Sequence, residues 1–426
     1  MQIRMPYGKN NLNVSLSDSF DISIIKPSFI PAIPEPRTAI RKVLKTPINS
    51  PALSELIQPD DRVGIIFNDI TRPTPNWLIL PEILAEIPYA PKQNIILFNA
   101  LGTHKKNSHH ELRQILGNRI VDNYRIIQNN PSDKSTQRYM GKTHFGNEIW
   151  INRELLDCDI KILTGFIEPH FFAGFSGGAK AIMPGMAGLN TIFGNHNAKM
   201  IDHPKATWLV SQGNPIFEEI REIGDKVKNL FLLNVTLNKN KEITGLFSGE
   251  VREAHTRGCN FVKESAMVPV QSPFDIIITT NSGYPLDINL YQSIKGMSAA
   301  AKVIKKGGAI IMATACQGGI PDHSSYSKLL HSNTTPGGLL ASIMSSPEVI
   351  TDQWQVQIQA LIQQKADVYV YSDGLTEGQI RSALFKPVKS IGSCVESLVN
   401  KMGPDTKICV LPEGPQTVPY VINDEA

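Results

Sequence analysis

Residues 165–185 hold the densest group of side chains that could carry out chemistry. Five glycines stand there beside His170, Ser176 and Lys180, in a setting of four phenylalanines. Glycines let backbone N–H groups approach an anion closely. Apolar surroundings shift the pKa of a lysine, so that its amine can act as a nucleophile. The segment is not a Walker loop, since Ala179 breaks the required Gly-Lys pair. A structural glycine-rich turn is the alternative, but such a turn does not need a histidine and a lysine.

Two more loops place polar residues directly after apolar runs. Residues 63–67 lead into Asp69 and Arg72, and residues 95–98 lead into His104. In open α/β sheets, ligands bind outside the carboxyl ends of the strands, and an imidazole there can act as acid or base near neutral pH. A capped turn with a surface arginine and a structural histidine are the plainer interpretations. Either loop, taken alone, is compatible with these plainer interpretations.

Further candidates lie later in the chain. His196 falls in what the pattern predicts as a helix start. Tyr291 and Lys295 are four residues apart and share one face of a predicted helix. Taken alone, that pair is typical of a half-exposed helix face, and Trp354 is typical of a core tryptophan.

The elements that must position these residues are short apolar runs separated by stretches of helical spacing. The runs lie at 63–67, 95–98, 160–163, 230–233, 276–278, 309–312, 368–371 and 408–411. They are apolar throughout rather than alternating, which is typical of buried parallel strands. Strand alternating with helix predicts an α/β fold with mostly parallel sheets. Residues 298–305 have the spacing of a helix that would end at the glycine pair 307–308.

A chain of 426 residues exceeds what one hydrophobic core usually serves, so two α/β domains are expected. The proline-bearing stretch at 268–273 marks the seam between them. We therefore predict a first domain over residues 1–270 and a second over residues 271–403. Residues 404–426 are a candidate to complete the first domain.

Composition excludes several classes of protein. The net charge is +3 without a basic stripe, which argues against nucleic-acid binding. No apolar run approaches the ~18 residues of a membrane helix, and no secretory signal is visible at the start, so a soluble cytoplasmic protein is expected. The five cysteines lie far apart without a C-x-x-C pair, so no zinc or iron–sulfur site built from cysteines is expected.

Taken together, these loops resemble those of the nickel-dependent lactate racemases. The likeness rests on NDITRP at 68–73, GTH at 102–104, EPHFFAGFSGGAK at 168–180, NH at 195–196, FSGE at 247–250, GYPLD at 283–287, KGM at 295–297 and DQW at 352–354. These segments cover most of the chain in the expected order. A combination of that length is specific, although each piece alone is weak.

The resemblance implies a cofactor, the nickel-pincer nucleotide derived from nicotinic acid. Lys180 matches the lysine that attaches to it covalently as a thioamide. His196 matches the protein's ligand to nickel, the other donors being two sulfurs and a carbon of the cofactor. His104 and His170 match a pair on opposite faces of the substrate. The other matched residues, which line the cofactor or the substrate, are Asp69, Thr71, Arg72, Ser176, Tyr291, Gln292, Lys295 and Trp354.

By the same resemblance, Arg72 polarises the reacting oxygen, and Lys295 with Gln292 meets the substrate carboxylate, in a cleft between the two domains. The implied activity is racemisation of a short 2-hydroxy acid, with lactate favoured, by reversible hydride transfer through a 2-keto acid. This route avoids removing a weakly acidic Cα proton beside a carboxylate, and two enantiomers need two bases. Cofactor-maturation enzymes are implied as partners.

The sequence leaves a different substrate and a non-enzymatic role open, and it argues against a dehydrogenase. Ile70 and Ala179 stand where some family members carry histidine and arginine, so the substrate can instead be malate or a larger aliphatic, aromatic or sugar acid. An NAD-dependent dehydrogenase would need G-x-G-x-x-G after a strand, and no such arrangement occurs in the sequence. The non-enzyme alternative is a nucleotide- or anion-binding module with incidental histidines.

Overall fold

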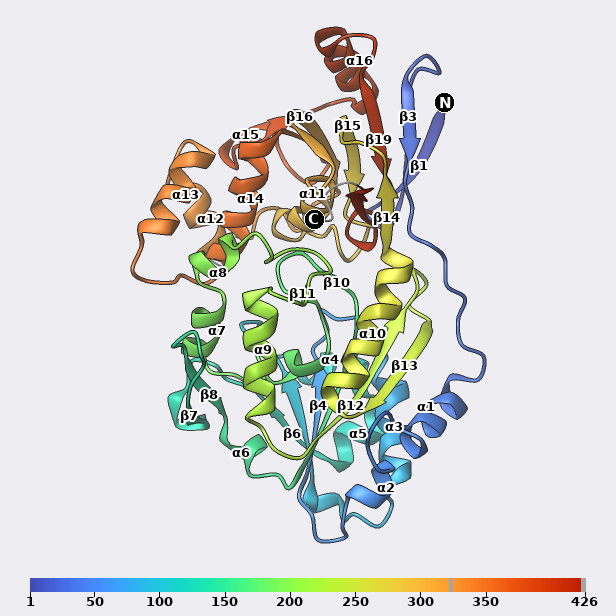
Figure 1. The fold of residues 1–426 in the computed structure, drawn as a ribbon, viewed down its shortest axis with the longest axis vertical. Helices are drawn as coiled ribbons and strands as arrows, with labels where there is room; N and C mark the ends of the chain where they lie inside the picture. Colours follow the sequence, from blue (N-terminus) through green and yellow to red (C-terminus); the bar gives the residue numbers. More distant parts are fainter. Residues whose placement is uncertain (322–324, 423–426) are drawn as a thin grey trace. The chain divides into compact units, whose positions relative to one another are not determined.

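The structure, a computed structural model, describes residues 1–321 and 325–422 (Figure 1). The chain divides into two compact units, and each unit draws on more than one stretch of sequence. The first unit comprises residues 29–196 and 203–264, and the second comprises residues 1–28, 197–202 and 265–426. Within the described residues, each unit is built on a six-stranded sheet.

The sheet of the first unit has the strand order β13-β12-β9-β4-β5-β6. Its strands are β4 (Val63–Asn68), β5 (Ile95–Ala100), β6 (Arg125–Gln128), β9 (Ile160–Phe166), β12 (Leu230–Leu237) and β13 (Ile243–Gly249). β13 runs antiparallel to β12, and the other pairings are parallel. From β4 the chain winds through β5 to β6 and then returns to the other side of β4 with β9. Open α/β sheets bind ligands at such a reversal.

Helices and two short hairpins complete the first unit, and Figure 1 shows helices α1, α3, α9 and α10 around its strands. The helices are α1 (Pro36–Lys45), α2 (Leu53–Leu56), α3 (Asn76–Glu86), α4 (His109–Leu116), α5 (Asn118–Asn123), α6 (Arg153–Leu156), α7 (Leu189–Asn195), α9 (Pro215–Asp225) and α10 (Val251–Ala266). The hairpins pair β7 (Gln137–Lys142) with β8 (Glu148–Asn152), and β10 (Pro169–His170) with β11 (Gly174–Phe175). Ser108 and Glu111 form a capping box at the start of α4.

The core of this unit explains why the apolar runs form strands. Ile65, Leu97, Ile162 and Leu233 come from four neighbouring strands and have no solvent-exposed surface. Burial of each such side chain stabilises the fold by about 1.5–3 kcal/mol relative to leaving it exposed. A sheet covered on both faces therefore needs apolar residues at successive positions, as the sequence shows.

The second unit has an all-parallel sheet with the strand order β18-β17-β16-β15-β19-β3. Its strands are β3 (Asp21–Ile24), β15 (Phe274–Thr280), β16 (Ile304–Ala313), β17 (Asp367–Tyr371), β18 (Lys386–Pro387) and β19 (Lys407–Leu411). A hairpin of β1 (Gln2–Tyr7) and β2 (Asn10–Ser15) and a parallel pair of β14 (Met267–Val270) and β20 (Val418–Val421) accompany it. The helices are α8 (Ala198–Asp202), α11 (Leu290–Ala300), α12 (Ser325–Leu330), α13 (Pro336–Ser345), α14 (Gln353–Lys365), α15 (Glu377–Ser382) and α16 (Ile391–Met402).

All eight predicted runs are strands, in mostly parallel sheets, which confirms the predicted α/β fold. The division of the chain differs from the predicted one at both ends. Residues 1–28 belong to the second unit because β3 pairs with β19, and residues 404–426 belong there too because β19 pairs with β15. The stretch predicted as a seam contains strand β14 rather than a linker.

One predicted helix is wrong in its extent. The helix expected at residues 298–305 is α11, which ends at Ala300, and β16 has already begun at Ile304. The glycine pair at 307–308 lies inside β16, where the register with β15 shifts, rather than at a helix end. No helix in the described part of the chain is long and apolar enough to cross a membrane.

Candidate functional site

Three loops of the first unit carry most of the predicted site residues, and they follow adjacent strands. β9, β4 and β5 are neighbours and parallel, so their carboxyl ends lie side by side. The loop after β5 is joined to the loop after β9 because the Gly102 N–H donates to the Gly185 carbonyl at 3.2 Å. A Cβ atom on Gly185 would lie 2.8 Å from Cβ of Ala100, so glycine permits this close approach.

Asp69 and His104 form a hydrogen-bonded pair between two of these loops. Asp69 Oδ2 lies 3.0 Å from His104 Nδ1, and the carboxylate also accepts from the Thr71 hydroxyl at 3.0 Å. The Arg72 N–H donates to the Asp69 carbonyl at 3.1 Å, which closes the turn after β4. Asp69 is buried, whereas the His104 side chain is 38% exposed. A rigid buried carboxylate therefore holds an accessible imidazole.

The Asp69 carboxyl group stays ionised in this setting. Burial, the largest single influence, raises its pKa. The hydrogen bond and positive charge of His104, the charge of Arg72 and the Thr71 hydroxyl all act the other way, and together they lower the pKa below its ordinary value. A charged acceptor is thus available to His104 at neutral pH.

His170 lies in the loop after β9, among aromatic rings. Its Nδ1 accepts a hydrogen bond from the Ala173 N–H at 3.2 Å, and its ring stacks against Phe171 and meets the edge of Phe172. The Phe172 ring also packs edge-on against His196, with centroids 5.1 Å apart. Phe172 therefore stands between the two histidines and fixes both.

Lys180 lies in a short 3₁₀ turn (Gly178–Ala181) that the strand residue Asn234 holds in place. Asn234 Oδ1 accepts the Gly178 N–H at 2.7 Å. Gly178 has a φ of +58°, and a Cβ atom there would lie 2.5 Å from Nδ1 of His255. Only glycine fits this position. Gly178 is therefore required by the packing of the turn, whatever the turn binds.

His196 is buried and neutral. Burial, together with the positive charge of Lys180, lowers its pKa to about 3. A neutral imidazole is the form that binds metals. Its place differs from the predicted helix start: His196 ends α7, and Asn197 caps the following helix α8 by accepting the Met200 N–H at 3.0 Å.

Ser176 has a local partner set that shapes the loop after β9. Its hydroxyl accepts the Glu168 N–H at 2.9 Å and donates to the Phe166 carbonyl at 3.1 Å. Thr71 likewise donates to Asp69. The cofactor contacts predicted for Ser176, Thr71 and Arg72 stay predictions.

The second unit brings together two of its predicted residues. Trp354 of α14 donates from Nε1 to the Tyr291 hydroxyl at 3.3 Å, and Gln355 donates to the Tyr291 carbonyl at 2.5 Å. Gln292 and Lys295 lie on the same helix, α11, half-buried. The residues of this unit that were predicted to line the site therefore lie at the start of α11 and on α14.

Sequence reasoning missed three buried polar residues that support the site: Asn234, Glu219 and His255. Asn234 had a signal, because it interrupts the apolar run of β12. Glu219 of α9 accepts from Asn195, the residue before His196, at 2.8 Å. His255 of α10 stands within 2.9 Å of the Ser176 carbonyl through Nε2. The last two lie on helices with ordinary spacing, and no local pattern marks them.

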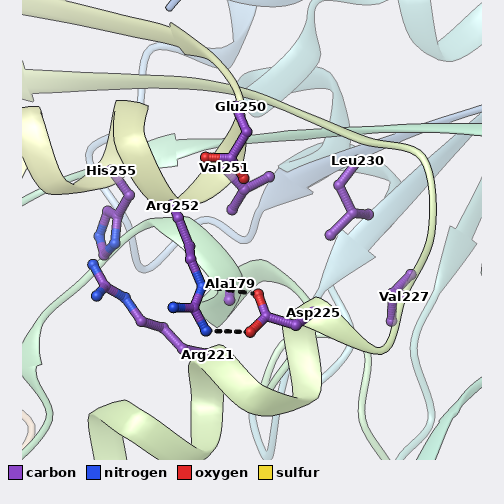
Figure 2. Close-up of a pocket in the computed structure, with 10 residues that line it drawn as sticks. Ala179, Arg221, Asp225, Val227, Leu230, Glu250, Val251, Arg252 and His255 are labelled. Atoms are coloured by element: carbon purple, nitrogen blue, oxygen red, sulfur yellow. Dashed lines mark hydrogen bonds and ion pairs between the residues drawn. The ribbon is translucent and has the colours of Figure 1, made fainter. Parts of the chain in front are cut away.

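A cavity of about 230 Å³ lies on another side of the lysine-bearing turn (Figure 2). Its lining residues are Ala179, Arg221, Gly224, Asp225, Val227, Leu230, Glu250, Val251, Arg252 and His255. Arg252 pairs with Asp225, as Figure 2 shows, and Glu250 accepts the Glu253 N–H at the start of α10. None of the predicted site residues lines this cavity, so it backs the turn and is separate from the site.

His255 makes the stability of the fold depend on pH. Burial lowers its pKa to about 4, with the charges of Arg221 and Lys180 acting in the same direction. The unfolded chain binds the proton at a pKa of ~6.5, so stability is fully present above that value and falls as the pH drops toward 4. The expected loss from this group is roughly 3 kcal/mol at pH ~4.

Chemical unfolding of wild type and His255→Gln between pH ~4.5 and ~7 measures this effect, and the variant should lose part of the slope. Glutamine can still donate to the Ser176 carbonyl. His110→Gln, on the exposed face of α4, is the control and should keep the full slope. An unchanged slope in His255→Gln would contradict the prediction.

A mostly parallel sheet is typical of an α/β enzyme when the loops at its carboxyl edge carry two accessible or half-buried histidines, a lysine and a buried neutral histidine. Comparison with known proteins names the class. Residues 7–209 match the family described as "Lactate racemase N-terminal domain", and residues 270–418 match "Lactate racemase C-terminal domain". A lactate racemase from Thermoanaerobacterium thermosaccharolyticum is 34% identical over 421 residues, 97% of either chain. One from Lactiplantibacillus plantarum is 34% identical over 418 residues, 97% of this chain and 98% of the relative.

The chain belongs to the lactate racemase family, and it is an enzyme of the isomerase class. The structure of the lactate racemase apoprotein from T. thermosaccharolyticum has a TM-score of 0.92 at 32% identity, covering 99% of this chain and 100% of that one. A crystal structure of a protein from Thermotoga maritima is similar in fold alone, with a TM-score of 0.68 at 17% identity over 90% of this chain and 98% of that one.

Proposed function

We propose that the protein interconverts the D and L enantiomers of a short 2-hydroxy acid, with lactate favoured, using a nickel-pincer nucleotide attached to Lys180. The observation that carries this proposal is the gathering of His104, His170, Lys180 and His196 at one edge of one sheet. The names of the relatives support lactate as the substrate.

The residues present fit such a cofactor. No three His, Cys, Asp or Glu side chains converge on a metal site within residues 1–321 and 325–422. A metal here must therefore bring most of its own donors, as a nickel already bound by sulfur and carbon would. His196 would hold the metal as a neutral imidazole, and Lys180, whose charge acts on His196, would hold the organic part.

When bound, this group would supply a carbon that accepts and returns a hydride. The chain's own side chains do the rest. His104, held by Asp69, takes the hydroxyl proton, and the imidazole of His170 serves the other face of the substrate. The Arg72 guanidinium stabilises negative charge on the reacting oxygen, and Lys295 with Gln292 binds the carboxylate. The buried rings of Phe171 and Phe172 cover part of the His170 ring.

The enzyme made together with cofactor-maturation enzymes should racemise at least one 2-hydroxy acid. A panel of lactate, malate and larger aliphatic, aromatic and sugar acids, followed by chiral chromatography, identifies which. His104→Gln and His170→Gln should each lower kcat by about 10²- to 10⁴-fold, since each removes an acid–base group.

Two outcomes would contradict the proposal and favour a nucleotide- or anion-binding module. One is the absence of turnover on every acid by protein that carries the cofactor. The other is unchanged racemisation in both histidine variants. His110→Gln, on the exposed face of α4, is the matched control and should keep full activity.

A further inference from the structure

The two histidines of the proposed acid–base pair differ in what their Nδ1 atoms do. His104 Nδ1 faces a carboxylate oxygen of Asp69 at 3.0 Å. His170 Nδ1 faces the backbone N–H of Ala173 at 3.2 Å. One partner can only accept a hydrogen bond, and the other can only donate one.

Neutral imidazole carries one N–H and one bare nitrogen, so the partner of one nitrogen decides the state of the other. Ionised Asp69 accepts, so Nδ1 of His104 must carry the proton and Nε2 is bare. The Ala173 N–H donates, so Nδ1 of His170 must be bare and Nε2 carries the proton. In the neutral rings, Nε2 of His104 can therefore accept a proton, whereas Nε2 of His170 can donate one.

We propose that Asp69 and the Ala173 N–H hold His104 and His170 in opposite neutral tautomers, so that His104 is ready to take a proton and His170 is ready to present one. This inference rests on the proposed function for its chemical meaning. It makes Asp69 a positioning residue for His104 in addition to its predicted place beside the cofactor.

The surroundings of His104 agree with its role as base. When the substrate hydroxyl gives its proton to Nε2, the ring becomes a cation beside the Asp69 carboxylate. Asp69 keeps its charge at neutral pH because His104, Arg72 and Thr71 lower its pKa. A bound cofactor would supply the hydride acceptor, so that loss of this proton and of a hydride would turn the alcohol into a keto acid. His170 meets the same oxygen with an N–H.

Nitrogen-15 NMR of labelled histidine in the full chain without cofactor tests the tautomers directly. Spectra are recorded at increasing pH until the histidine signals no longer change, so that the neutral rings are compared. The signals are assigned with His104→Gln and His170→Gln, each of which removes one set. We expect the Nδ1–H pattern for His104 and the Nε2–H pattern for His170.

The same NMR measurement on Asp69→Asn protein tests whether the carboxylate sets the tautomer of His104. The asparagine amide can donate to Nδ1, so His104 should change to the Nε2–H pattern while His170 keeps its own. Asp133→Asn, an exposed carboxylate that caps a 3₁₀ turn, is the control and should change neither. The same tautomer in both wild-type histidines, or an unchanged His104 pattern in Asp69→Asn, would overturn the inference.

The activity of Asp69→Asn protein that carries the cofactor gives an independent readout. Loss of a correctly oriented base should lower kcat by about 10²- to 10⁴-fold with little change in KM, because substrate binding does not depend on the tautomer. The NMR arm needs no cofactor, so its failure leaves the proposed racemase intact. Absence of turnover with the expected tautomers contradicts only the proposed function.

Discussion

Lys180→Ala protein, made together with the cofactor-maturation enzymes, is expected to carry no covalent adduct and to lose racemisation by roughly 10³-fold or more. A tether converts a bimolecular encounter with the cofactor into a fixed arrangement, and that advantage disappears with the amine. Intact-mass measurement of wild type and variant checks the adduct, and chiral chromatography checks the activity.

Lys180→Arg separates the role of the tether from that of the charge. Arginine keeps a cation in the 3₁₀ turn but cannot form the thioamide, so this variant should also lack the adduct. Lys199→Ala, an exposed lysine on α8, is the matched control and should keep adduct and activity. An unchanged mass shift in Lys180→Ala would contradict the assignment, and peptide mapping would then locate the true attachment.

The proposed attachment at Lys180 would also change the electrostatics of the buried histidines. The ammonium charge now lowers the pKa of both His196 and His255. A thioamide would carry no such charge, so attachment would remove a cation from the neighbourhood in which His196 would hold nickel. Attachment at Lys180 would therefore favour metal binding at His196.

The strands and the loops that follow them could be predicted because their signals are local. An apolar run of four to eight residues with polar residues directly after it gives both the strand and the edge of the sheet where a site can form. The Ser108–Glu111 capping box was predictable for the same reason.

The predictions that failed concern elements whose structure depends on partners distant in sequence. β3 is short and largely exposed, and only its pairing with β19, almost 400 residues later, makes it a strand of the second unit. The glycines at 307–308 were expected to end a helix, but the strand partner Phe274–Thr280 accommodates them in a shift of register. The roles of His255 and Glu219 likewise arise from contacts that no local spacing encodes.

Glu219→Leu is expected to destabilise the first unit by roughly 3–5 kcal/mol, since several buried donors lose their acceptor together. Glu219 lies in α9 with no exposed surface. Its carboxylate accepts from the Thr143 hydroxyl at 2.6 Å and from the side-chain amides of Asn147 and Asn195 at 2.8 Å each. Chemical unfolding of wild type and variant measures the loss.

Glu219→Gln and Glu218→Gln complete the comparison. Glutamine has one acceptor oxygen and one donor group, so it can satisfy part of this set and should cost less than leucine. Glu218 is the exposed neighbour on the same helix, and its replacement should change stability by no more than about 1 kcal/mol. Equal stability of Glu219→Leu and wild type would contradict the argument.

The same carboxylate should also affect the metal. Asn195 is the last residue of α7 and precedes His196, so a displaced Asn195 moves the imidazole that would bind nickel. Nickel content per chain should therefore fall in Glu219→Gln even where the protein remains folded. An apolar residue of similar volume would fill the space equally well, but only an acceptor with two oxygens can satisfy three donors at once. The buried Glu219 side chain thus supports the position of His196 as well as the stability of the fold.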